Sequence, residues 1–235
     1  PMFSVLYKPR KDVSIYANYI EGLSQGATAP TTAANAGEVF PPYKTKQTEL
    51  GAKWDMGRLA ATASVFQIKR PSSLIDPQTN IYSFGGEQRH RGVELSLFGE
   101  VAPGLRMLGG AAWTDAEIVR SQSGLIQGNT AVGVPKHQYN LNVEWDVPAL
   151  AGLTLTARAT YTGSQYVNAS NTQQIPSWTR YDLGGRYATR WPARPVVLRA
   201  NIENVTDRAY WIGYGNGWLS TSMPRTLLLS ASFSF

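Results

Sequence analysis

The stretch that decides the fold is Leu153-Thr154-Leu155-Thr156-Ala157-Arg158-Ala159-Thr160-Tyr161-Thr162. Its apolar and polar residues alternate, so an extended chain separates them onto opposite faces, whereas helical spacing would mix the two sets. This period of two is typical of a β-strand with one apolar and one polar face. The same alternation recurs in four further segments: 13–19, 139–146, 196–203 and 227–235.

Weaker alternating segments complete an all-β chain in which no helix is needed. We predict about eleven strands, at residues 2–8, 13–22, 44–54, 59–69, 81–101, 105–116, 136–147, 153–163, 178–188, 195–206 and 225–235. The segment 81–101 could instead be two short strands, because Gly85-Gly86 and Gly92 are candidates for a bulge or a break.

Composition excludes several classes of protein. The 235 residues include no Cys and two His, which excludes a disulfide scaffold and a Cys nucleophile and leaves little for an imidazole metal site. No apolar run reaches the roughly 18 residues of a membrane-spanning helix. The net charge of +6 is spread along the chain, with the nearest approaches to a basic run at Arg89-His90-Arg91 and Arg10-Lys11. Nucleic-acid binders concentrate such charge on one face, so we expect no nucleic-acid partner.

The connections between the predicted strands alternate in length. The short ones are 9–12, 55–58, 102–104, 148–152 and 189–194. The long ones are 23–43, 70–80, 117–135, 164–177 and 207–224. In an up-and-down antiparallel sheet this alternation puts the tight turns at one rim and the long loops at the other. That is the layout of bacterial outer-membrane barrels, with short periplasmic turns and long extracellular loops.

Three features predict that the apolar face meets lipid and that the polar face lines a lumen. Small residues of the apolar set would underfill the interior of so large a barrel: Ala17, Ala61, Ala63, Gly109, Ala111, Ala157, Ala159 and Ala200. The opposite set carries mid-strand charges that a wet lumen tolerates: Glu94, Arg106, Glu144, Arg158, Asp182, Arg186, Arg199 and Glu203. Aromatic residues of the apolar set lie toward strand ends, as interfacial girdles do: Tyr19, Trp54, Trp113, Tyr139, Trp145, Tyr161, Tyr181 and Tyr187.

Several segments resemble those of one known family, the TonB-dependent outer-membrane siderophore receptors. The last strand, 225–235, resembles the family's terminal strand, and its final Phe235 is similar to the aromatic residue read by the barrel-assembly machinery. Residues 201–210 resemble the penultimate-strand signature, in which Asn, apolar and Asp-Arg positions lead to an aromatic residue. Further matches lie at 89–95, at 6–9 with 14–17, and at 135–137. They follow the family's order and spacing over essentially the whole chain.

The resemblance implies a particular organisation. Family members close a barrel of 22 strands around an amino-terminal plug, and neither the plug nor the segment that engages the energy-coupling protein is present here. We therefore expect residues 1–235 to be the carboxy-terminal portion of the barrel. The implied function is binding and passage of a ferric siderophore across the outer membrane, energised by TonB-ExbB-ExbD through the amino-terminal part. The iron arrives inside the siderophore, so no cofactor, protein metal site or catalysis is expected.

The predicted long loops supply the candidate binding residues. Segments 121–135, 164–177 and 209–224 contain no charged residue, and 23–43 contains only Glu38. Uncharged, aromatic walls suit a chelate of low net charge, such as a hydroxamate, whereas an anionic catecholate would favour Arg and Lys. The candidate ligand-binding residues are Tyr43, Tyr166, Trp178, Tyr210, Trp211, Tyr214 and Trp218. Ordinary polar surface loops with interfacial aromatics are the alternative interpretation.

Two other functional classes stay open at this stage. An outer-membrane lipase or protease could use His137 with a Ser and an acid such as Asp115, although no Gly-x-Ser-x-Gly elbow is present. A passive porin would lack a plug. For the charged residues on the lumen face we expect a ladder of cross-strand ion pairs rather than a transport pathway.

Overall fold

The computed structural model describes residues 1–75, 79–121, 124–190, 194–214 and 218–233. Within these ranges, no helix is long and apolar enough to cross a membrane. The strands are β1 (Met2–Arg10), β2 (Val13–Ser24), β3 (Tyr43–Asp55), β4 (Leu59–Ile75), β5 (Tyr82–Ala102), β6 (Leu105–Arg120), β7 (His137–Asp146), β8 (Leu153–Thr162), β9 (Gln165–Tyr166), β10 (Gln174–Ile175), β11 (Trp178–Arg190), β12 (Pro195–Glu203), β13 (Trp211–Gly213), β14 (Leu219–Thr221) and β15 (Thr226–Phe233).

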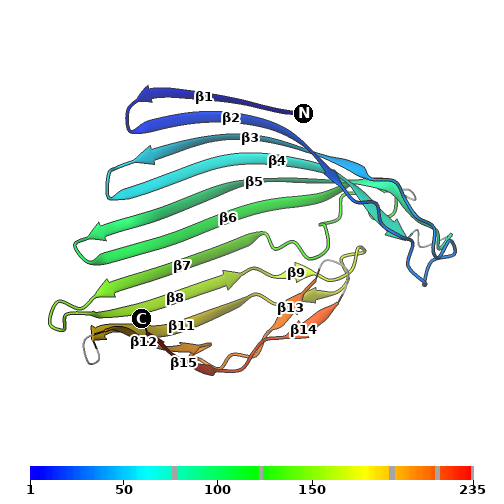
Figure 1. Cartoon of the computed structure of the whole chain (residues 1–235). Helices are drawn as coiled ribbons and strands as arrows, with labels where there is room; N and C mark the ends of the chain where they lie inside the picture. Colours follow the sequence, from blue (N-terminus) through cyan, green and yellow to red (C-terminus); the bar gives the residue numbers. More distant parts are fainter. Residues whose placement is uncertain (76–78, 122–123, 191–193, 215–217, 234–235) are drawn as a thin grey trace.

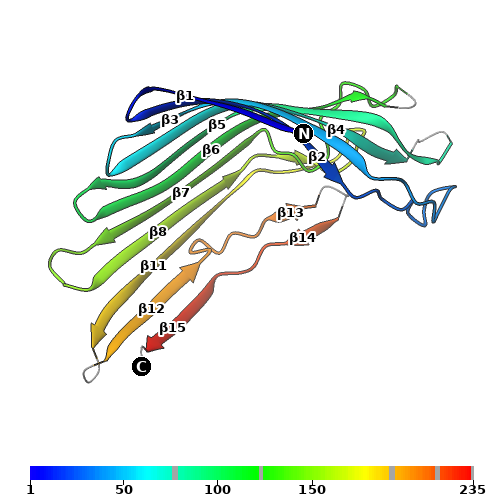
Figure 2. The same cartoon turned by 45° about the horizontal axis from the view of Figure 1, so that its top comes forward.

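Eleven of these strands form one antiparallel sheet in the order β1-β2-β3-β4-β5-β6-β7-β8-β11-β12-β15. Figure 1 shows them side by side, from β1 in blue to β15 in red, and the turned view in Figure 2 shows that the sheet is curved. The two remaining strand pairs, β9–β10 and β13–β14, are small hairpins in the loops. The predicted all-β, up-and-down antiparallel wall of a barrel is confirmed.

The predicted strands of the sheet agree with the observed ones apart from the positions of some ends, and two of the outcomes are informative. The segment 81–101 is one strand of 21 residues, β5, paired with β4 and β6 across Gly92. The two-strand alternative is therefore wrong. The strand predicted at 195–206 ends at Glu203, because Asn204 adopts a left-handed backbone conformation with a φ of 53°. The end of the last predicted strand, with Phe235, lies outside the described residues.

The two rims of the sheet differ as predicted. The turns between β1 and β2, β3 and β4, β5 and β6, and β7 and β8 lie together at the left end of the sheet in Figure 1. The long loops and the hairpins β9–β10 and β13–β14 extend from the right end. We call these ends the short-turn rim and the long-loop rim. The predicted loop 70–80 is shorter than expected, because β4 continues to Ile75.

The apolar set of side chains lies on the exposed outer face of the sheet, as predicted. Leu155 is 43% exposed and Phe233 is 51% exposed, although both are large and apolar. Buried polar residues such as Thr154 and Asp182 belong to the opposite set. Val196 is the exception in the apolar set, with only 2% of its surface exposed between its register partners Thr189 and Phe233. The outer face is therefore suited to hydrocarbon and the inner face to water.

The short-turn rim is fixed by local polar contacts. In the β1–β2 turn, Arg10 donates to both carboxylate oxygens of Asp12, and the indole of Trp54 on β3 donates to the same residue over 3.1 Å. Partial desolvation opposes ionisation of Asp12, but its backbone hydrogen bond and the bonds from Arg10 and Trp54 outweigh it, so the pKa of this carboxyl is lowered. The first turn is thereby tied to its neighbour.

Candidate ligand-binding rim

The loops of the long-loop rim form two groups. The first loop group consists of residues 25–42 and 79–81, between β2 and β3 and between β4 and β5. Ala34 donates its N–H to the carbonyl of Asn80, and the side chain of Asn35 bonds both the N–H and the carbonyl of Tyr82. Paired backbone groups of this kind give a loop a defined position over the wall.

Aromatic side chains gather at the base of the first loop group. The ring of Phe84 has its centroid 5.1 Å from that of Tyr43, 5.3 Å from that of Phe40 and 5.9 Å from that of Tyr82. Of these four residues, only Tyr43 is a predicted candidate. Phe40 lies in a predicted loop but is not among the candidates, and Tyr82 and Phe84 lie in the predicted strand 81–101. Their alternation at 82 and 84 was the available signal that they share a face.

The second loop group consists of residues 124–136, 163–177, 204–214 and 218–225. Asn171 accepts from the N–H of Thr130 and donates to its carbonyl, over 2.7 and 2.9 Å. The N–H of Gly133 donates to the carbonyl of Tyr166. A Cβ placed on Gly213 of β13 would lie 3.1 Å from Ile175 of β10, so the two small hairpins lie against each other. The three loops form one connected unit.

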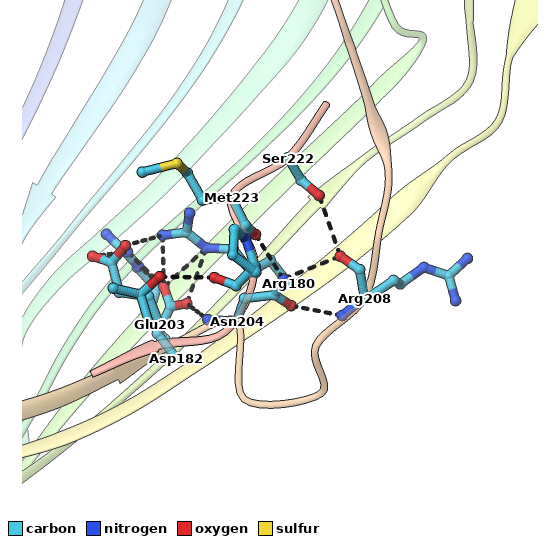
Figure 3. Close-up of polar contacts among 10 residues, drawn as sticks. Arg180, Asp182, Glu203, Asn204, Arg208, Ser222 and Met223 are labelled. Atoms are coloured by element: carbon cyan, nitrogen blue, oxygen red, sulfur yellow. Dashed lines mark hydrogen bonds and ion pairs between the residues drawn. The ribbon is translucent and has the colours of Figure 1, made fainter. Parts of the chain in front are cut away.

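Asn204 anchors the last loop of this unit to the wall (Figure 3). It is 1% exposed. Its side-chain amide donates to the carbonyls of Arg208 and Met223 over 3.1 and 3.0 Å, and its side-chain oxygen accepts from the N–H of Arg208. One side chain therefore holds both ends of the loop 208–223. The sequence shows this Asn as part of the penultimate-strand motif, but neither its burial nor its positive φ can be read from the sequence.

The backbone of Asn204 is bonded in turn to a network of charged side chains on the inner face of the sheet. The N–H of Asn204 donates to Asp182 on β11 over 2.8 Å. Asp182 also pairs with Arg158 on β8 and with Arg180, and both guanidinium groups lie 3.9 Å from Glu203. Figure 3 shows Arg180, Asp182 and Glu203 beside Asn204. A buried carboxylate requires such pairing.

The predicted ion-pair ladder is confirmed for most of its members. Arg106 pairs with Glu144 and Asp146, and Arg186 reaches Glu144 over 3.2 Å. Arg199 instead donates to the hydroxyl of Ser232, and Glu94 makes no ion pair with the part of the chain that is described. The ladder therefore runs mainly over β6, β7, β8, β11 and β12.

The structure divides the seven predicted candidates between the two loop groups. Tyr43 belongs to the first loop group. The other six lie in the second loop group or at its base: Tyr166 on β9, Trp178 at the start of β11, Tyr210 before β13, and Trp211, Tyr214 and Trp218 on the exposed β13–β14 hairpin. Of the six, Trp178 and Tyr210 stack on each other, with ring centroids 4.1 Å apart and planes 16° apart.

Trp178 carries a free donor. Its Nε1 atom is buried and has no hydrogen-bond partner among the described residues. Trp178 belongs to the inward-facing set of β11, together with Arg180 and Asp182. Buried polar groups are generally satisfied, so this unpaired indole N–H is an exception among the described residues.

The described residues bear on two further possibilities, a metal site and the enzyme alternative that names His137 and Asp115. Within the described ranges, no group of three or more His, Asp or Glu side chains could hold a metal ion. Asp115 is paired with Arg91, and the ring of His137 stacks on Tyr139. The two residues named for the enzyme alternative therefore have other partners.

Fold and rim together define a class: the wall of an up-and-down β-barrel with an apolar outer face, tight turns at one rim and anchored, aromatic and largely uncharged loops at the other. Residues 1–205 match the family model described as TonB dependent receptor-like, beta-barrel. The chain thus belongs to the TonB-dependent receptor β-barrel family, a family of outer-membrane receptors and not of enzymes. The expectation from the sequence motifs is confirmed.

Individual relatives support the assignment. The chain is 40% identical over 242 residues to the ferrichrome receptor FcuA of Yersinia enterocolitica, covering 100% of this chain and 32% of that protein. It is 31% identical over 211 residues to the ferrichrome outer membrane transporter/phage receptor of Escherichia coli K12, covering 85% and 27%. The crystal structure of BauA, the ferric preacinetobactin receptor of Acinetobacter baumannii, superposes with a TM-score of 0.87 at 45% identity, covering 100% and 36%. The chain spans about a third of the length of these relatives.

Proposed function

We propose that the protein is an outer-membrane receptor that binds a ferric siderophore at the long-loop rim and passes it inward with energy from the TonB system. Family membership supports the class of function, and two of the relatives are named as receptors for ferrichrome and ferric preacinetobactin. Iron is cargo in this proposal, carried within its organic chelate.

Residues 1–235 would be the carboxy-terminal portion of the receptor barrel. Two observations support this organisation: the chain spans about a third of its relatives, and β1 and β15 are edge strands of the described sheet. Unpaired strand edges are not tolerated in lipid, so further strands must pair with these edges to close the wall. A plug and a TonB-contacting segment would belong to the rest of the receptor.

The observation that carries the binding site is the stacked pair of Trp178 and Tyr210 with its unpaired indole donor. It lies at the base of loops that contain no charged residue over 124–135, 164–177 and 218–224. A neutral chelate with oxygen atoms, such as a ferric hydroxamate, matches a hydrogen-bond donor beside an aromatic wall. The exposed Trp211, Tyr214 and Trp218 would make the first contacts.

The test is a binding titration on the full-length receptor with a ferric hydroxamate and a ferric catecholate. Trp178→Phe keeps an aromatic ring and removes the donor, and we expect it to weaken hydroxamate binding about tenfold. Trp145→Phe, on the outer face of β7, is the matched control and should bind as the wild type does. Unchanged binding in Trp178→Phe would remove Trp178 from the site, and failure of every chelate to bind would contradict the receptor assignment.

Transport and assembly need separate tests. Uptake of the bound chelate should stop in cells without TonB, whereas a passive porin would conduct without energy or chelate.

Phe235 is proposed to be read by the barrel-assembly machinery, and Phe235→Ala should lower the amount of receptor in the outer membrane. Equal amounts of the variant and the wild type would exclude that role.

A further inference from the structure

One arginine of the inner face has a neutral partner where its neighbours have carboxylates. Arg70 belongs to the same alternating set of β4 as Ser64, the register partner of the inward-facing Glu94. It donates from Nε and from one terminal nitrogen to the side-chain oxygen of Gln88 on β5, over 3.2 and 2.9 Å, and makes no ion pair with any residue of the described chain. Four other arginines of the inner face each pair with an Asp or Glu: Arg106, Arg158, Arg180 and Arg186. The charge of Arg70 is therefore not neutralised locally.

Gln88 is held so that its side-chain oxygen faces Arg70. It is 9% exposed, and its amide nitrogen donates to the buried hydroxyl of Ser72 over 2.8 Å. The Nε2 atom of His90 lies 3.3 Å from the same oxygen of Gln88. Because an amide carries no net charge, these bonds orient the guanidinium group without neutralising it. Arg70 itself is exposed, so its remaining N–H donors are open to the lumen.

The inward-facing carboxylates of the adjacent strands lie too far along the wall to compensate Arg70. Glu49 of β3 and Glu94 of β5 are level with Phe66 and Ser64 of β4 in the strand register. Those positions are four and six residues from Arg70, which corresponds to about 13 and 20 Å along a strand. A carboxylate that pairs with Arg70 is therefore expected from outside the described chain.

Arg70 lies between the two loop groups of the long-loop rim. Along β5 toward that rim, Gln88 is followed by Phe84, which belongs to the aromatic base of the first loop group. On β6 the register partner of Gln88 is Ile118, whose backbone bonds residues 128–129 of the second loop group. Neighbouring strands are about 4.8 Å apart, so the strand that carries these loop contacts lies about 10 Å from that of Arg70. A chelate held among the loops is within reach of this cation.

We propose that Arg70, oriented by Gln88, binds an anionic group at the periphery of the ferric chelate, such as a carboxylate. A guanidinium group and a carboxylate form charge-assisted, directional hydrogen bonds that a neutral amide partner does not replace. This inference rests on the proposed siderophore function and narrows it. The iron-binding part of the ligand is neutral, as the uncharged loops favour, and its periphery bears one negative charge.

The test uses the full-length receptor and two linear ferric trihydroxamates that differ only at one end, where one has a carboxylate and the other a primary amide. We expect the wild type to bind the carboxylate form about tenfold more tightly, as for one charge-assisted pair. Arg70→Gln should bind both forms alike, and so should Gln88→Glu, because it supplies Arg70 with a carboxylate from the protein. Arg199→Gln removes an inner-face charge on β12 that is bonded to Ser232, and as the matched control it should keep the preference.

The outcomes separate this inference from the proposed function. The amide form should bind equally to all four proteins, which shows that the variants are folded. Equal binding of the two forms by the wild type, or a preference that persists in Arg70→Gln, would exclude recognition of an anionic group by Arg70 and leave the receptor function standing. The same loss of preference in Arg199→Gln would reduce the effect to the charge of the lumen as a whole. Failure of both forms to bind would overturn the inference together with the hydroxamate specificity on which it rests.

Discussion

Asn204 satisfies backbone groups that would otherwise be buried without partners. Its amide meets the carbonyls of Arg208 and Met223, and its own φ of 53° is one that Asn tolerates better than most residues. Asn204→Gly keeps the conformation and loses the bonds, whereas Asn204→Ala loses the bonds and strains the backbone. We expect the free energy of unfolding to fall by about 2 kcal/mol in the Gly variant and by about 3 kcal/mol in the Ala variant.

Chemical denaturation of the full-length receptor measures this difference, and limited proteolysis of the loop 208–223 shows whether the loss is local. Thr206→Ala, exposed in the same turn, serves as the control and should leave stability unchanged. Equal stability of the Gly, Ala and wild-type proteins would show that the anchor contributes nothing.

The stack of Trp178 and Tyr210 predicts an energetic coupling between β11 and the last loop. A double-mutant cycle with Trp178→Leu and Tyr210→Leu should give a coupling of about 1 kcal/mol, the usual value for an aromatic pair. The cycle of Trp178→Leu with Trp211→Leu is the comparison, since Trp211 is exposed on β13, and it should be additive. Additivity in both cycles would mean that the stack does not hold the loop.

At the scale of the element, β5 depends on the absence of a side chain at one position. A Cβ on Gly92 would overlap the backbone oxygen of Trp113 and press on the ring of Phe66. Gly92→Ala is therefore expected to destabilise the barrel by about 2 kcal/mol or more, as overpacked sites do. Gly22→Ala, in β2, meets nothing within 4 Å and should be neutral. Thermal unfolding of both variants decides the matter, and equal melting temperatures would contradict this account of Gly92.

The ion-pair ladder between β8, β11 and β12 makes a second prediction at this scale. Asp182 is 8% exposed and accepts from Arg158, Arg180 and the N–H of Asn204. Asp182→Asn leaves two guanidinium groups without their shared carboxylate and should cost about 3 kcal/mol of stability. Asp115→Asn breaks an exposed pair with Arg91 and should cost less than about 1 kcal/mol. Equal denaturant midpoints for the Asp182→Asn and Asp115→Asn variants would contradict the predicted difference in stability.

The sequence predicts the wall well and the loops poorly, for a physical reason. A period of two over ten residues, as in 153–162, reports which face of a strand is apolar, and that pattern persists because one face meets lipid. The hairpins β9–β10 and β13–β14 have strands of two or three residues, too short to show any period. They are positioned by contacts such as that of Asn171 with Thr130, which join residues 41 apart in the chain.

At the scale of the whole molecule, the edges of the sheet at β1 and β15 determine whether this chain can form a barrel by itself. Residues 1–235 expressed by themselves should fail to form a heat-modifiable barrel in detergent, because both edges would expose unpaired backbone groups to an apolar medium. Electrophoresis of unheated samples measures this, with the full-length receptor as the control that migrates as a folded barrel. A compact, heat-modifiable species from the short chain alone would show that the edges find another partner.

The candidate sites show the same limit of sequence reasoning at the largest scale. Trp178 and Tyr210 were predicted one by one as aromatic residues of neutral loops, but their stacking follows only from the register that brings β11 beside the last loop. Likewise, Lys46, Lys69 and Arg89 lie on three different strands and become register neighbours only through strand pairing. Local pattern determines which face a residue occupies, whereas its neighbours are determined by topology.

The anchor at Asn204 has a consequence for how such receptors diversify. Because one buried amide bonds the backbone carbonyls of Arg208 and Met223, both ends of the segment between them are fixed by contacts that do not depend on the side chains of these two residues. Surface loops tolerate insertions and deletions, so we expect sequence changes between these ends to leave the bonds of Asn204 and the wall in place. Evolution or protein engineering can therefore change ligand recognition by this loop while the fold of the barrel wall stays the same.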